Sequence, residues 1–80
     1  MTTYERLVKV FTNVFGDEIQ LENISEQASL RDDLGMNSIG MLYMAMALEE
    51  EFQVKFSNDD FKNLATVQDV LQVLEGKIKS

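Results

Sequence analysis

Residues 33–52 read DLGMNSIGMLYMAMALEEEF and contain the longest nearly uncharged run of the chain. Asn37 is a good N-cap, because its side chain can accept a hydrogen bond from an early backbone N–H, so we expect a helix from Ser38 to about Phe52. Residues 39–48 carry no charge, and the three glutamates at 49–51 return the helix to water. A chain of 80 residues has a small core and can hardly bury such a helix on all sides.

The apolar side chains of this helix divide between two faces. One face carries Met41, Met44, Ala45, Leu48 and Phe52. Another face carries Ile39, Leu42, Tyr43 and Met46. A helix that is apolar on most sides is either buried all round or has an extra apolar surface with another role. We therefore predict that the two faces have different roles, one of them outside the core.

Three further helices are expected, at Thr3–Phe15, Asp59–Asn63 and Val67 to about Lys77. Each is preceded by Ser or Thr with an acid three residues later, the pattern of a capping box, at Thr2 with Glu5, Ser57 with Asp60, and Thr66 with Asp69. The first helix has an apolar stripe of Tyr4, Leu7, Phe11, Val14 and Phe15. The last has a stripe of Val67, Val70, Leu71, Leu74 and Ile78.

The expected fold class is all-α, a small four-helix bundle of three main helices and one short helix. A long first loop, Asp17–Asn37, lacks periodicity and is expected to be pinned to the core by isolated aliphatic side chains, with one helical turn near Leu30. No stretch reads convincingly as a strand. Residues 1–80 are expected to form one domain.

The composition excludes several function classes. The net charge of −7 disfavours nucleic acid as a partner and favours partners with basic surfaces. Histidine and cysteine are absent, so Ser–His and Cys–His catalysis, disulfides and a zinc site built on those residues are excluded. No signal peptide pattern and no membrane-spanning run is present. We expect a cytoplasmic monomer without membrane insertion.

Ser38 is the candidate for chemistry. It stands at the start of the predicted second helix, where backbone N–H groups and the positive end of the helix dipole favour a phosphate. Serine is also frequent at helix starts for structural reasons alone, so its position by itself leaves both interpretations open.

The residues around Ser38 add a resemblance. Asp33-Leu34-Gly35-Met36-Asn37-Ser38-Ile39, followed by Met46-Ala47-Leu48-Glu49-Glu50-Glu51-Phe52, resembles the acyl carrier protein family, which reads Asp-Leu-Gly-x-Asp-Ser-Leu and then a very similar helix end. Ala65-Thr66-Val67-Gln68-Asp69-Val70 is similar to the entry of that family's last helix. The resemblance covers nearly the whole chain.

The resemblance implies that Ser38 receives 4′-phosphopantetheine from coenzyme A through a phosphopantetheinyl transferase. The thiol of this arm would carry acyl groups as thioesters, so the protein would be a carrier and not an enzyme. The flanking recognition positions would be Asp33, Leu34, Gly35, Asn37 and Ile39. Acyl-transferring, condensing or adenylating enzymes would dock on the second helix at Met41, Leu42, Tyr43, Met46, Glu49 and Glu50.

The sequence departs from the family pattern at four positions. Asn37 replaces the aspartate before the serine, and Ile39 replaces the leucine after it. Gly40 and Tyr43 stand where carriers of primary fatty acid synthesis usually have acids. These departures favour a fatty-acid-like, polyketide or other specialised pathway with more apolar docking. Two alternatives remain open: a peptidyl or aminoacyl carrier that works with an adenylating enzyme, and a helical adaptor that is never modified.

Overall fold

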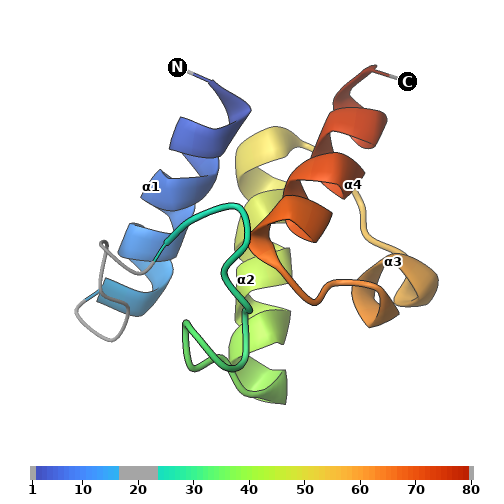
Figure 1. The fold of residues 1–80 in the computed structure, drawn as a ribbon. Coiled ribbons are helices and arrows are strands. Elements are labelled where there is room, and N and C mark those ends of the chain that lie inside the picture. Colours follow the sequence, from blue (N-terminus) through green and yellow to red (C-terminus); the bar gives the residue numbers. More distant parts are fainter. Residues whose placement is uncertain (1, 17–23, 80) are drawn as a thin grey trace.

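The computed structural model describes residues 2–16 and 24–79. These residues form four helices and the segments that connect them (Figure 1). They are α1 Thr3–Phe15, α2 Ser38–Phe52, α3 Asn58–Lys62 and α4 Val67–Lys79. The predicted all-α bundle of three main helices and one short helix is confirmed. Within the described ranges, the one strand-type pairing is an isolated bridge between Ser29 and Thr66, and no helix is long and apolar enough to cross a membrane. Residues 17–23 of the predicted loop lie outside these ranges.

The three long helices form the body of the bundle. α1 packs against α2 and α4, and the short α3 lies at the edge of the bundle beside α4 (Figure 1). The start of α2, which holds Ser38, lies at the end of the bundle opposite the beginning of α1 and the end of α4 (Figure 1). The last turns of α1 and the first turns of α2 therefore meet at one end of the molecule.

Local hydrogen bonds fix where the helices begin. Thr2 Oγ1 accepts from the backbone N–H of Glu5 at 3.1 Å, and Glu5 Oε1 accepts from the backbone N–H of Thr2 at 3.1 Å. The other two predicted pairs form the same reciprocal bonds, Ser57 with Asp60 and Thr66 with Asp69. All three predicted capping boxes are confirmed, so short sequence patterns set the starts of α1, α3 and α4.

The core lies between α2 and the facing sides of α1 and α4. α2 buries the first of its two predicted faces, Met41, Met44, Ala45, Leu48 and Phe52. The other two long helices bury Leu7, Val10, Phe11, Val67, Val70, Leu71 and Leu74. This burial of aliphatic and aromatic side chains provides the main stabilisation of a chain that has no disulfide.

Two residues of the predicted core stripes are exposed, which corrects the sequence-based expectation. α1 buries Val10, which the predicted stripe did not include, in addition to Leu7 and Phe11. Val14 lies at the surface between α1 and α2. Leu74 is the last of the described α4 residues that is buried. Ile78 lies one turn further along α4, beyond the end of the core, and is exposed.

The connection that leads to α2 is pinned to the start of α4. Leu30 donates its backbone N–H to the carbonyl of Ala65 at 2.9 Å, and Val67 donates to the carbonyl of Ala28 at 3.1 Å. The predicted helical turn near Leu30 is confirmed, because the N–H groups of Asp33 and Leu34 donate to the carbonyl of Ser29. The side chains of Leu30, Leu34 and Met36 are buried, so isolated aliphatic side chains anchor this part of the loop as expected.

Among the residues that the structure describes, two ion pairs connect elements at the surface. Arg6 of α1 contacts Glu51 Oε2 at 3.2 Å and lies 4.3 Å from the centre of the Phe52 ring. Lys77 of α4 contacts Asp60 Oδ2 at 2.8 Å and so connects α4 with α3. The hydrogen bond from the Lys77 ammonium, followed in size by that from the Ser57 backbone, lowers the pKa of Asp60 from 3.8 to about 2.

Asp60→Asn is expected to reduce the dependence of stability on pH between about pH 4 and 2. The wild-type carboxylate protonates near pH 3.8 in the unfolded chain but only near pH 2 in the folded protein, so its contribution to stability is complete above pH 4 and is lost as the pH falls to about 2. Thermal unfolding at a series of pH values measures this slope. A variant with the same acid slope as the wild type would show that the pair between α3 and α4 does not contribute to it.

Candidate functional site

Ser38 is the first residue of α2 and its side chain is exposed. Asn37 is the N-cap, as predicted, and its Oδ1 accepts from the backbone N–H of Gly40 at 2.7 Å. The first turn of α2 contains no acidic residue. No acid of this turn therefore offsets the partial positive charge at the helix end, which favours a phosphodiester on Ser38. The residues present fit the attachment of a phosphopantetheine arm.

The loop before Ser38 is held in shape by its own side chains. Asp33 Oδ2 accepts from the backbone N–H of Ser29 at 2.7 Å, and Ser29 Oγ accepts from the backbone N–H of Asp32 at 3.1 Å. Gly35 has φ +72°, a left-handed conformation that favours glycine. Leu34 is buried in the core. The structure thus gives Asp33, Leu34 and Gly35 a role in shaping the loop that leads to Ser38.

The second apolar face of α2 lies at the surface. Ile39 is 64% exposed and Tyr43 is 59% exposed, and Leu42 and Met46 are exposed to a similar degree. The prediction that one of the two apolar faces lies outside the core is confirmed. The expectation that Met41 docks partners is wrong. Met41 is 2% exposed, because it lies one helical turn from Ala45 on the face of α2 that packs in the core. A partner cannot reach this side chain in the folded protein.

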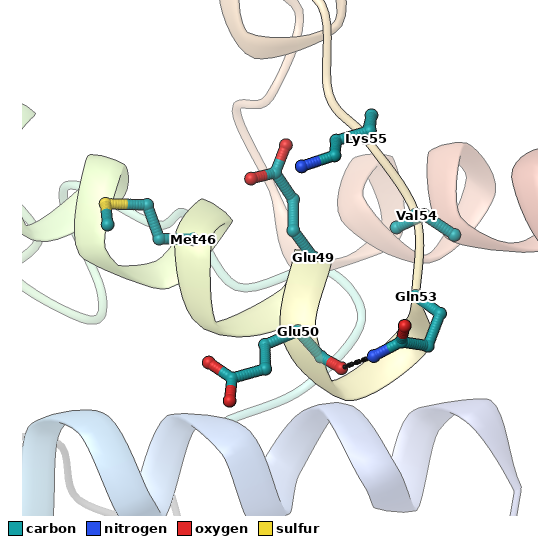
Figure 2. Close-up of a pocket in the computed structure, with 6 residues that line it drawn as sticks. All are labelled: Met46, Glu49, Glu50, Gln53, Val54 and Lys55. Carbon is teal, nitrogen blue, oxygen red and sulfur yellow. Dashed lines mark hydrogen bonds between the residues drawn. The ribbon is translucent and has the colours of Figure 1, made fainter.

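The two glutamates expected to contact partners border a hollow of about 370 Å³ at the end of α2 (Figure 2). Glu49 Oε2 accepts from the backbone N–H of Phe56 at 2.8 Å, so this carboxylate supports the connection to α3. Gln53 Nε2 donates to the backbone carbonyl of Glu50 at 2.7 Å, the bond drawn in Figure 2. The Glu50 carboxylate extends away from that bond (Figure 2), and the residue is exposed. Glu50 is therefore better placed than Glu49 to meet a partner.

A groove of about 410 Å³ lies next to Ser38, between the end of α1 and the start of α2. Its lining residues are Val14, Phe15, Asn37, Ile39, Gly40 and Tyr43. Sequence reasoning did not find this groove, because Val14 and Phe15 were interpreted as core residues and come from a different helix. Their position in the last turn of an amphipathic helix was the available signal, but it does not show which helix lies opposite.

Sequence comparisons with known proteins lead to one family. Residues 5–74 match the family described as "Phosphopantetheine attachment site". An acyl carrier protein of Nitratidesulfovibrio vulgaris is 30% identical over 77 residues, which cover 96% of this chain and 99% of that protein. An acyl carrier protein of Zymomonas mobilis is 33% identical over 73 residues, or 91% of each chain. An acyl carrier protein of Bdellovibrio bacteriovorus is 41% identical over 59 residues, 74% of this chain and 76% of that protein.

Proteins of this class are small carrier domains that hold a phosphopantetheine arm, and the helical bundle fits that class. The chain belongs to the acyl carrier protein family. It is therefore a carrier and not an enzyme, its cofactor is 4′-phosphopantetheine, and it works with partner enzymes. The absence of histidine and cysteine from the chain is understandable on this basis, because the reactive thiol belongs to the cofactor.

Proposed function

We propose that Ser38 is the residue that a phosphopantetheinyl transferase modifies, and that the chain then presents acyl thioesters to the enzymes of a specialised pathway. The observation that supports this most directly is the placement of Ser38, an exposed hydroxyl at the first position of α2, at a helix end with no acid in its first turn. The loop before it is pinned by buried Leu34 and by the Ser29–Asp33 hydrogen bond, which keeps Ser38 in a defined place at the surface.

Attachment requires little of this chain beyond an accessible hydroxyl. Ser38 Oγ forms a bond to phosphorus, the P–O–P link of coenzyme A breaks, the nucleotide half leaves, and the hydroxyl proton passes to the transferase. Once attached, the arm supplies a thiol on which acyl groups are held as thioesters. Tethering raises the local concentration of the acyl group at each docked enzyme, to on the order of millimolar for a short flexible link.

The outer face of α2 is the proposed docking surface for partner enzymes. It offers exposed Leu42, Tyr43 and Met46, followed by Glu50 at the end of the helix. A contiguous apolar surface with an acid at its edge suits a partner that has an apolar centre and a basic rim. This pattern supports a fatty-acid-like, polyketide or other specialised pathway, and the cytoplasmic location and monomeric state predicted from the sequence are part of the same proposal.

The experiment that tests the attachment site is intact mass spectrometry before and after incubation with coenzyme A and a broad-specificity phosphopantetheinyl transferase. Addition of a single phosphopantetheine, located on Ser38 by fragmentation, supports the proposal. If only the Asn37→Asp variant is modified, the transferase rejects the neutral residue and the site is still Ser38. If neither protein is modified, the assignment of Ser38 as the attachment site is wrong.

A further inference from the structure

We propose that the groove between the end of α1 and the start of α2 seats the apolar, dimethyl-bearing part of the phosphopantetheine arm itself, so that the empty arm rests against Val14, Phe15 and Tyr43. This inference rests on the proposed attachment at Ser38 and adds a binding surface for the arm. It is independent of what the thiol carries.

The occupant follows from the position of the groove. Asn37, Ile39 and Gly40 line it, and these residues flank Ser38 in the chain. The carbon that bears two methyl groups lies close to the phosphate of the arm and is the first apolar part of the arm after the attachment point. It can reach only surfaces near Ser38, and the groove is an apolar surface that begins there.

Gly40 keeps the groove open. A Cβ at this position would lie 3.3 Å from Asn37 Oδ1, a tight approach, and 3.4 Å from Phe15 Cε1, at the lower limit of ordinary contact. Glycine in the first turn of a helix otherwise lowers stability, by up to about 1 kcal/mol relative to alanine. A methyl group here would press on Asn37 Oδ1 and reach the edge of the Phe15 ring, so glycine leaves this part of the groove unobstructed.

The walls of the groove are suited to an apolar group. Val14 and Ile39 are exposed aliphatic side chains, and Phe15 is half-buried with its ring edge-on to Phe11 at a centroid distance of 6.4 Å. The buried Phe11 ring therefore supports one wall from below. Because the arm is tethered beside the groove, weak contact is enough to hold it there for part of the time.

The groove shares residues with the proposed docking surface. Ile39 and Tyr43 are exposed on the outer face of α2 and also line the groove. A partner enzyme that covers these two side chains would compete with the seated arm. Docking would thereby release the arm from the carrier at the moment when a partner is present to receive it.

The test compares nuclear magnetic resonance spectra of the unmodified chain and of the chain carrying the arm without an acyl group. We expect the Val14 methyl and Phe15 ring signals to shift on attachment, and the Ile78 methyl signals to stay in place. Val14 and Phe15 lie near Ser38 in space, so direct contact is identified by nuclear Overhauser effects between the two methyl groups of the arm and these side chains, in addition to the shifts. Complete attachment, checked by mass, without a change at Val14 and Phe15 would overturn the inference and leave the proposed function intact.

Two variants and a matched control sharpen the result. Val14→Asn places an amide in the groove without touching the N-cap, and Gly40→Ala adds a methyl group that narrows the groove beside Phe15. Both variants are expected to reduce the shift at Phe15 on attachment. Ile78→Asn makes the same kind of change at an exposed aliphatic residue of α4 and should leave the shift unchanged.

Shifts that appear only after an acyl group is loaded would show that the groove takes cargo and not the arm. Failure of attachment itself would instead refute the proposed function and remove the basis of this inference.

Discussion

Ser38→Ala is expected to abolish addition of phosphopantetheine completely and to leave the helical fold intact. The variant removes the one atom that forms the bond to phosphorus, so no residual modification is expected. Ser38 is exposed and is not the N-cap, since Asn37 provides that function. Alanine is a good helix former at such a position. Intact mass after incubation with coenzyme A and the transferase measures the loss, and circular dichroism confirms that the variant is folded.

The other serines of the described residues provide the controls. Ser29 Oγ and Ser57 Oγ each accept a backbone hydrogen bond that caps a turn or a helix, from Asp32 and Asp60. Ser25 is exposed and lies in the loop before the Ser29 turn, so Ser25→Ala should be modified as fully as the wild type. Modification of Ser38→Ala at any other serine would contradict the assignment and move the attachment site.

The helices were predictable because their signals are local. The starts of α1, α3 and α4 follow from Ser or Thr with an acid three residues later, and α2 begins after Asn37. Each of these signals involves side chains within one turn of the backbone groups that they satisfy, so no knowledge of the tertiary structure is needed. The predicted bounds of α1 and α2 agree with the structure at both ends.

The errors concern which side of a helix faces which neighbour. Periodicity placed Met41 and Leu42 on different faces of α2, and the structure agrees, yet both were expected to dock partners. In an almost uncharged helix no polar side marks the solvent, so periodicity defines two faces without showing which of them is buried. The groove beside Ser38 could not be predicted for a related reason, since it exists only where α1 approaches Gly40.

Phe11→Ala is expected to produce the largest loss of stability. Phe11 is fully buried at the centre of the core face of α1 and packs edge-on against Phe15 at an interplanar angle of 79°. Truncation of a buried phenylalanine costs about 3–5 kcal/mol, and the total stability of a domain is about 5–15 kcal/mol, with small domains at the low end. We therefore expect the midpoint of urea unfolding to fall by more than about 1 M, given a slope of about 1–3 kcal/mol per M.

Lys9→Ala on the same helix is the control, because Lys9 is exposed and alanine preserves helix propensity. Its effect on the free energy of unfolding should stay within about 0.5 kcal/mol. Phe11→Leu keeps an apolar side chain, so its loss of unfolding free energy should lie between those of Lys9→Ala and Phe11→Ala.

Loss of the Phe11 ring also removes the support beneath Phe15 in the groove. A Phe11→Leu variant that still folds should therefore show a smaller shift of the Val14 signals when the arm is attached. An unfolding midpoint for Phe11→Ala equal to that of Lys9→Ala would mean that α1 does not pack through this residue.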